Sequence, residues 1–286
     1  MKKIISLMLS LCILLCAAAC EKKAAAPPPE AEWRGKIIET RQFAARGEYD
    51  AAAAKLPNGV KAIIVPHHGV ALSLTAQMIS GLAAQSPKTV VLFAPNHFAK
   101  GPKIASTYAA FSTHDGLVLP KERGLRLLES KLLAGMDDAL FREEHSIGAV
   151  VPVIARYLPD VQIIPLVFQK GAYYGDAKQV IEAVGAFSDP DTVLIASIDF
   201  SHGLPSEREP ERRAKMLEYI QAFDSSAILE LDETYLDAPV VLAALLQQLR
   251  TNGYDNISVF ASTNAAEMLG VGRLQDTTGY LTIAFH

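Results

Sequence analysis

The chain has little cysteine. Three of its 286 residues are cysteines, Cys12, Cys16 and Cys20, and none follows position 20. The long remainder of the sequence can therefore form no disulfide and offers no thiolate to a metal. A metal site in that part must be built from histidine and carboxylate side chains.

An excess of basic residues is also absent. The 27 lysines and arginines are outnumbered by 31 acidic residues, which gives a formal net charge of -4. A nucleic-acid-binding protein usually carries a basic patch, so we expect no nucleic-acid partner. Half of the residues are hydrophobic, and the length is sufficient for one large domain with a substantial core.

The first twenty residues differ from the rest. Lys2 and Lys3 precede an apolar run over residues 4–19 that ends at Cys20. A charged start followed by a short hydrophobic region predicts a secretory signal. The run is shorter than the stretch that a transmembrane helix usually needs. Residues 15–20, Leu-Cys-Ala-Ala-Ala-Cys, resemble a bacterial lipobox, whose cysteine is lipidated.

We therefore predict a lipoprotein signal peptide over residues 1–20, lipidation of Cys20, and a disordered tether over residues 21–35, rich in Ala and Pro. The expected location is the bacterial cell envelope, with the lipid in the membrane and the protein facing the periplasm or the exterior. An ordinary cleaved signal peptide is the alternative. We find no internal repeat and no later linker, so residues 36–286 are expected to form one domain.

Histidines follow three short apolar runs, over residues 61–65, 89–94 and 192–197. These runs predict strands that are buried on both faces of a mostly parallel sheet. His67 and His68 follow the first run, His97 the second and His202 the third. Ligands bind at the carboxyl ends of such strands, and imidazole is the commonest protein metal ligand, so a metal pocket is expected there.

The remaining pattern alternates helices and strands along the chain. The order predicts a single α/β domain with a mostly parallel central sheet, helices on both faces and the metal pocket at the carboxyl ends of the strands. Helices are expected over residues 41–55, 71–85, 125–133, 146–158, 178–187 and 239–249, and further strands over 162–168, 257–262 and 279–285.

Four short motifs resemble those of the Memo-like family. Residues 66–69, Pro-His-His-Gly, resemble its Pro-His-Ala-Gly turn, and residues 94–97, Ala-Pro-Asn-His, its Gly-Pro-Asn/Ser-His turn. Residues 144–147, Glu-His-Ser-Ile, are similar to its Glu-His-Ser-Ile/Leu helix start. Residues 197–203 resemble its Ser-Ser-Asp-Phe-Ser/Cys-His signature. The resemblance covers residues 60–286, and four motifs in the same order are specific.

The resemblance implies a fold related to the class III extradiol dioxygenases, which hold non-haem iron(II) with two histidines and a carboxylate. Bacterial members often occur as protein B of the AmmeMemoRadiSam system, so the other components of that system are expected partners. Animal members look like metal-binding redox or signalling proteins. Such a family fixes the fold better than it fixes the reaction.

The resemblance also implies site residues. His67 and His97 match the two metal-binding histidines of the family, and Asp199 and His202 match an acid and a histidine of the same pocket. Animal members add a cysteine near the C-terminus. Bacterial relatives tend to place a carboxylate in the matching stretch, where this chain has Glu267. The segment 235–239 lacks the cysteine and glycine that usually precede the following helix.

The chemistry of these residue types does not determine which metal would bind. Two imidazoles and one carboxylate on one face suit iron(II) and leave positions for substrate and dioxygen, which favours a dioxygenase-like oxidoreductase acting on a small molecule. Zinc with three such ligands would activate water for hydrolysis, and copper is a third alternative. A non-catalytic binding or scaffold protein with a vestigial metal pocket is the other class of function.

The roles expected of the other site residues are catalytic. His202 is predicted to be a general acid or base, with Asp199 fixing its tautomer. His145 begins a predicted helix and is assigned either to catalysis or to helix capping and a structural hydrogen bond.

Overall fold

The computed structural model describes residues 33–45, 47–187, 189–232 and 234–286. The predicted signal peptide, Cys20 and residues 21–32 of the predicted tether lie outside the described residues. Within the described ranges, no helix combines the length and the apolar character needed to cross a membrane.

Four parallel strands form the centre of the molecule. In spatial order they are β8 (Gln162–Gln169), β3 (Thr89–Asn96), β9 (Thr192–Ser197) and β2 (Ala62–Val65). Strand β9 comes last along the chain but lies between β3 and β2. The three histidine-bearing or acid-bearing turns that follow β2, β3 and β9 therefore leave adjacent strands at the same edge of the sheet.

These strands are buried on both faces, as the continuous apolar runs predict. Every residue of β2 and β9 is buried. Along β2, Ile63 and Val65 pack in one core layer and Ala62 and Ile64 in the other. Because successive side chains of a strand point to opposite faces, each strand contributes to two cores.

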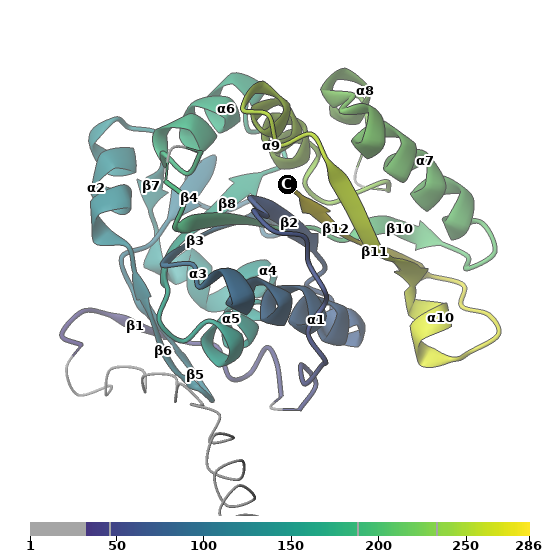
Figure 1. Cartoon of the computed structure of the whole chain (residues 1–286), viewed down its shortest axis with the longest axis horizontal. Coiled ribbons are helices and arrows are strands. Elements are labelled where there is room, and N and C mark those ends of the chain that lie inside the picture. Colours follow the sequence, from purple (N-terminus) through teal and green to yellow (C-terminus); the bar gives the residue numbers. More distant parts are fainter. Residues whose placement is uncertain (1–32, 46, 188, 233) are drawn as a thin grey trace, which may run out of the picture.

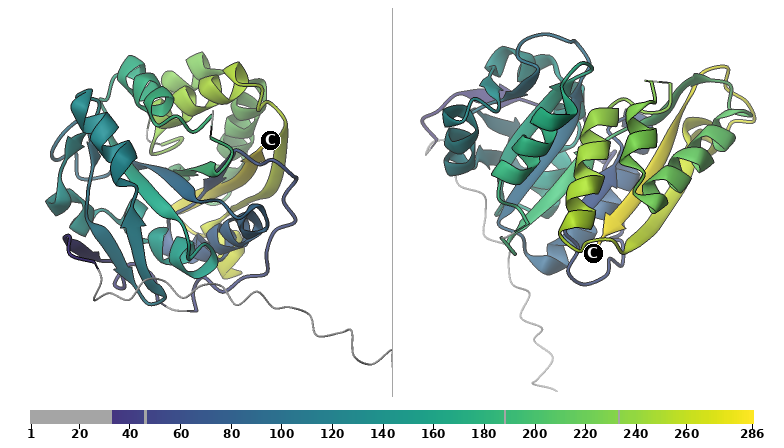
Figure 2. Two further views of the ribbon diagram at one scale, coloured as in Figure 1. Left: turned by 60° about the vertical axis from the view of Figure 1, so that its left-hand side comes forward. Right: turned by 90° about the horizontal axis from the view of Figure 1, so that it is seen from above.

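Helices cover both faces of the sheet (Figures 1 and 2). Those whose side chains share a core layer with Ile63 and Val65 are α1 (Leu72–Leu82), α3 (Asp138–Glu143), α4 (His145–Gly148) and α5 (Val151–Tyr157). Those on the layer of Ala62 and Ile64 are α2 (Glu122–Ser130), α6 (Tyr174–Ala183), α7 (Glu209–Ala222), α8 (Ser225–Leu229) and α9 (Pro239–Thr251). The predicted single-domain α/β fold with a mostly parallel sheet is confirmed.

Shorter or antiparallel strands extend the sheet on both sides. Next to β2 lies β12 (Thr277–Phe285), which pairs with β10 (Phe200–Leu204) and β11 (Ile257–Asn264). The other side carries β6 (Gly116–Pro120), β5 (Ala110–Thr113), β1 (Ile37–Glu39), β4 (Ile104–Ser106) and β7 (Gly135–Met136). The remaining α-helix of the described chain is α10 (Ala265–Leu269), and single 3-10 turns, Gly69–Ala71 and Ala83–Gln85, flank α1.

The helix predicted over residues 41–55 is wrong, because residues 41–45 and 47–55 form turns and irregular chain. Its backbone groups find partners outside the segment: the N–H of Ala51 donates to the hydroxyl of Tyr157, and the N–H of Ala54 donates to the carbonyl of Gln77. These tertiary hydrogen bonds, together with burial of Tyr49, replace the local bonds of a helix.

Several other elements also differ from the prediction. The helix predicted over 146–158 is two helices, α4 and α5, because Pro152 has no N–H with which to continue the hydrogen bonds of α4. The turn expected around His202 is strand β10, which pairs with β12. Helix α7 is absent from the sequence-based expectation, and α2 and α6 begin three and four residues earlier than expected.

Candidate metal centre

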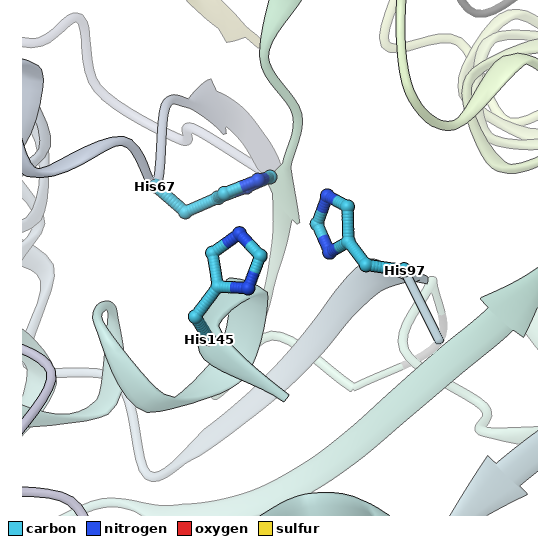
Figure 3. A group of neighbouring side chains, drawn as sticks. All are labelled: His67, His97 and His145. Carbon is cyan, nitrogen blue, oxygen red and sulfur yellow. The ribbon is translucent and has the colours of Figure 1, made fainter. Parts of the chain in front are cut away.

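The sheet brings the predicted site residues together. His67 lies two residues after β2, Asp199 two residues after β9, and His97 directly after β3. Since β9 lies between β2 and β3, these side chains leave three adjacent strand ends. Figure 3 shows the rings of His67 and His97 converging with that of His145, which begins α4.

The hydrogen bonds of His67 define which ring nitrogen faces the site. Its Nδ1 lies 2.9 Å from the hydroxyl of Ser197, and that hydroxyl donates its own proton to the carbonyl of Ser146 at 2.8 Å. Nδ1 of His67 must therefore carry a proton and donate it to Ser197. Nε2 is left toward the site, 3.2 Å from Oδ2 of Asp237 and 3.4 Å from Oδ2 of Asp199.

The buried His67 lies in a negative environment. Burial by itself would lower its pKa, but the carboxylates of Asp199, Asp237 and Glu144 outweigh burial and raise the pKa to about 9. In the metal-free protein the ring is thus cationic at neutral pH. The carboxylates that stabilise this positive charge would also stabilise a metal ion that replaced the proton.

His97 is held in the same way by Glu144. The carboxylate accepts the backbone N–H of His97 at 2.9 Å and faces Nδ1 of its ring at 2.7 Å. Burial would raise the pKa of Glu144, but these bonds and the N–H of Ser146 lower it to about 2, so the group is a carboxylate. Nδ1 therefore donates, and Nε2 of His97 lies 3.8 Å from Oδ2 of Asp237.

His145 adds a third imidazole. Its ring stacks on that of His97, with centroids 4.2 Å apart, and meets the edge of the His67 ring at 5.5 Å. Burial and the positive charges of His97 and His67 lower the pKa of His145 to about 4, so its ring is neutral at pH 7. The helix is capped by Glu144, which accepts the N–H of Ser146, so the capping role considered for His145 is wrong.

Asp237 supplies a carboxylate that the sequence reasoning missed. It lies in the loop before α9, and its Oδ2 accepts the backbone N–H of Asp199 at 3.2 Å while facing Nε2 of both His67 and His97. Its other oxygen, Oδ1, is buried and has no hydrogen-bond partner among the described residues. A buried carboxylate oxygen without a partner is costly, and a bound cation would satisfy it.

Two overlapping groups of side chains in the described part of the chain have the spacing of metal ligands. In each group the ligand atoms lie within 4.8 Å of one another; one group is His67, His97 and His145, and the other is His67, Asp199 and Asp237. Imidazole nitrogen and carboxylate oxygen are ligands for first-row divalent metals. These side chains are thus suitable ligands for a divalent metal ion, but their chemistry does not determine which metal binds.

Two of the predicted site residues lie apart from both groups. Glu267, predicted as the third ligand, is on α10, where its carboxylate accepts the hydroxyl of Thr263 and lies 3.7 Å from Arg213, with half of the side chain exposed. His202 is on β10 and its backbone N–H donates to the carbonyl of Thr234. Its Nε2 is buried without a partner in the described structure.

Asp199 also differs from its expected role. Its Oδ1 accepts the backbone N–H of His67 at 3.1 Å and its Oδ2 faces the His67 ring. The carboxylate thus orients His67, rather than His202 as the sequence suggested. The catalytic roles assigned to His202 and Asp199 stay predictions.

Comparison with known proteins gives consistent matches along most of the chain. A family model described as Memo-like protein matches residues 45–275. A MEMO1 family protein of Caldivirga maquilingensis is 25% identical over 238 residues, which cover 79% of this chain and 83% of that protein. A MEMO1 family protein of Methanopyrus kandleri is 29% identical over 188 residues, which cover 63% and 66%.

Among solved structures, an uncharacterized protein from Escherichia coli K12 aligns with 78% of this chain and 99% of its own, with a TM-score of 0.47 and 14% sequence identity.

Proposed function

Because the chain belongs to the Memo-like protein family, we propose that it is a metal-dependent oxidoreductase in which His67, His97 and Asp237 bind a divalent cation, with iron(II) the favoured ion. In this proposal Asp237 is the third ligand, the position that was predicted for Glu267 from the sequence. The substrate is a small molecule that reaches the metal from the cavity beside His97 and Asp237.

One observation carries the proposal. Ser197 and Glu144 engage Nδ1 of the two histidines, so both Nε2 atoms are left facing the same oxygen, Oδ2 of Asp237. Hydrogen bonds from Nδ1 to a hydroxyl or carboxylate are the usual way in which a protein fixes the tautomer of a metal-binding histidine. Two oriented imidazoles and one carboxylate form the donor set of non-haem iron oxygenases.

In this proposal the chain and the metal have separate tasks. Bound iron(II) supplies the redox chemistry with dioxygen that protein side chains lack. Ser197 and Glu144 hold the ligand rings in one orientation, and the buried Asp199 and Glu144 balance the charge of the cation. Burial of His67 and Asp199 would keep water away from a cation that these side chains hold.

A zinc-dependent hydrolase is the second candidate. His145 stacks on His97, and His67, His97 and His145 have ligand spacing without any carboxylate. Three protein ligands and one open position are the arrangement of catalytic zinc, which activates a water molecule. The two candidates share His67 and His97 but differ in the third ligand.

The test compares the metal content of single variants of the full chain by elemental analysis after loading with iron(II) or zinc. The iron proposal predicts that Asp237→Ala loses at least about nine-tenths of the metal and His145→Ala retains most of it. The zinc alternative predicts the reverse. Asp255→Ala and His114→Ala, at exposed positions, are matched controls that should retain the metal.

The double variant His67→Ala/His97→Ala should lose the metal under either candidate. If it binds as much metal as the wild-type chain, the site is misassigned and the non-catalytic binding protein with a vestigial pocket becomes the better account. Dioxygen consumption by the iron-loaded chain with small organic substrates then separates the oxidoreductase from a protein that only stores the metal.

A further inference from the structure

Leu132 is the most exposed large hydrophobic residue in the described part of the chain. It lies two residues after the end of α2, and 92% of it is exposed. Its φ of +55° places the backbone in the left-handed region, which helices commonly use just after their last turn and which glycine adopts most easily. A leucine there costs free energy that a glycine would not, and the exposed side chain gains nothing from packing. The fold therefore does not explain Leu132, which points to a contact outside the chain.

The outward face of α2 carries cationic and apolar side chains together. Leu125 and Leu128 are buried against the core, so the opposite face of the helix points away from the protein. Arg123, Leu127 and Lys131 are spaced four residues apart on that opposite face. Leu127 is 38% exposed, and both cations are exposed. Leu132 thus continues a surface in which apolar side chains lie between basic ones.

The acidic residues of α2 are engaged on another side of the helix. Glu122 pairs with Arg126 at 2.7 Å, and Glu129 accepts the hydroxyl of Tyr108 at 2.9 Å. These side chains line a separate cavity, on the side of α2 where residues 33–36 lie. Within the described ranges, Arg123 and the lysine that ends α2 form no ion pair. Their charges are therefore available to an anionic partner.

A surface cavity of about 330 Å³ lies beside Leu132, between the end of α2, β4 and α6. Lys131 and Lys103 both line it, and Asp176 is the one acid among its described lining residues. Tyr173, which directly precedes α6, is 77% exposed. Basic groups therefore outnumber acidic ones around two strongly exposed apolar side chains. Figure 1 shows α2 at an edge of the molecule, with α6 beside it.

The mixture of charges and apolar groups favours an anionic membrane as the partner. Lysine and arginine side chains are attracted to the phosphates of anionic lipids, while exposed leucine and tyrosine side chains enter the boundary between headgroups and acyl chains. A second copy of the chain fits less well. Pairing this face with itself would bring Arg123, Lys131 and Lys103 of one copy against the same cations of the other.

The start of the described chain supports the same partner. Trp33 and Lys36 line the cavity that Glu129 and Arg126 of α2 also line, so the chain enters the domain next to α2. The predicted lipid-bearing residue, Cys20, lies thirteen residues before Trp33, and a chain of that length spans at most about 45 Å. A membrane that held the lipid would therefore be within reach of α2.

We propose that Arg123, Leu127, Lys131, Leu132 and Lys103 form a surface, here called the α2 surface, that binds anionic phospholipid membranes, with Leu132 inserted among the lipids. Three cations and two apolar side chains give a weak contact that is sensitive to salt. The contact orients the domain on the membrane, whereas stable anchoring requires the lipid. It is independent of the metal and of the proposed oxidoreductase activity.

The test measures sedimentation of the protein with lipid vesicles. Residues 21–286 are used, because they contain every described element but neither the N-terminal apolar run nor a lipidated cysteine. Vesicles of phosphatidylcholine mixed with phosphatidylglycerol are expected to bind at least about tenfold more tightly than vesicles of phosphatidylcholine alone. Added salt should reduce this difference. Equal binding to the two kinds of vesicle, or binding to neither, would overturn the proposal.

Variants locate the binding on the α2 surface. Leu132→Gly should weaken vesicle binding about tenfold, because the inserted side chain is lost. Its thermal unfolding temperature should equal or exceed that of the wild type, because glycine adopts the left-handed backbone without strain. The double variant Lys103→Gln/Lys131→Gln should also bind about tenfold more weakly to the anionic vesicles.

The controls change similar residues on the opposite side of the molecule. Leu269→Ser on α10 removes a side chain that is 55% exposed, and Lys215→Gln on α7 removes one exposed cation (Figure 1). Both controls should bind the vesicles as the wild type does. Equal losses in the controls and in the α2 variants would overturn the assignment of the surface.

Two further outcomes would assign the surface to another partner. A dimer that forms with rising concentration and is abolished by Leu132→Gly, without vesicle binding, would identify a second copy. A photo-crosslinker placed at position 132 in the bacterium that captures a protein rather than lipid would identify a protein partner. A Leu132→Gly variant that unfolds at a lower temperature but binds vesicles normally would make Leu132 a structural residue. Each of these results would overturn the proposal.

Discussion

At the scale of single residues, the centre consists of side chains that face the metal position and side chains that orient them. Glu144 belongs to the second kind: it is fully buried, and both of its oxygens are used by His97. Ser197 has the same relation to His67. The orienting residues act through the histidines, so we expect their effect to be on metal affinity and on the stability of the fold.

The first prediction concerns Glu144 as a positioning residue. Glu144→Gln should weaken metal binding by about 10–100-fold, because the loss of the charged partner lowers the basicity of His97 and loosens its ring. Affinity is measured by competition with a chelator of known strength. Glu143→Gln, on the exposed neighbouring residue, is the control and should leave the affinity unchanged. Equal affinities in the two variants would contradict the role of Glu144.

The second prediction concerns the pH dependence of stability in the metal-free protein. The pKa of Glu144 is about 2 in the folded chain and 4.5 ordinarily, so its contribution is complete above pH 4.5 and is lost as the pH falls toward 2. The loss should be on the order of 3 kcal/mol of unfolding free energy.

Urea unfolding at pH 6, 4 and 3 measures this contribution. The curve of Glu144→Gln should be flatter over that interval than that of the wild type. An equally steep curve in the variant would assign the acid sensitivity to other carboxylates.

Sequence reasoning identifies the site residues that follow buried strands. His67, His97 and Asp199 are found because the strands before them are continuous apolar runs whose carboxyl ends meet. Asp237 is missed because its loop reaches the site only through the packing of α9 on the sheet, which no local pattern reveals. An acid two residues before a helix-initiating proline is the available signal, and it is weak.

At the scale of elements, a close contact between β12 and α7 holds these two elements together at one side of the sheet. Gly279 on β12 leaves room for the fully buried Glu209 at the start of α7, whose carboxylate pairs with Arg213 at 2.9 Å and accepts from Asn264. A Cβ at Gly279 would collide with that carboxylate and lie 3.2 Å from the carbonyl oxygen of Phe200.

The third prediction follows from this contact. Gly279→Ala should destabilise the chain by about 1–3 kcal/mol, because the buried ion pair and strand β10 cannot both move away from the added methyl group. Gly175→Ala, in α6 with open space around it, should change stability by less than about 1 kcal/mol and in the stabilising direction. Thermal or urea unfolding compares them, and similar values for the two variants would contradict the tight contact.

The elements predicted correctly from the sequence are those with a strong local hydrophobic pattern. The buried strands β2, β3, β8 and β9 are mainly apolar, with polar residues only near their ends, and are found nearly to the residue. The segment 41–55 has helical composition, but its backbone bonds to α1 and α5. Helix α7 is missed because its sequence, EPERRAKMLEYIQA, is mainly polar and buries only a few positions, among them Met216 and Ile220.

At the scale of the whole molecule, the proposed attachment to a membrane depends on Cys20. The fourth prediction is that Cys20→Ser, in the full chain expressed in a bacterium, leaves the protein unprocessed or in the soluble fraction. Lipidation of the cysteine supplies the two-chain attachment that stable anchoring requires. Detergent partition of the two forms provides the measurement, and equal membrane fractions would refute the lipoprotein assignment.

The position of β9 determines when the candidate metal centre can form during folding. Neighbouring strands are about 4.8 Å apart, so β2 and β3, with β9 between them, are separated by about twice that distance. Strand β9 follows both of them in the chain by about a hundred residues or more. During synthesis both histidine turns emerge early, but nothing lies between them until residues 192–197 insert, and Asp237 follows later still. Closing so long a loop is entropically costly and slow. We therefore expect that a cation would not nucleate this fold, and that any cation bound by the candidate centre would enter late, after nearly the whole chain has left the ribosome.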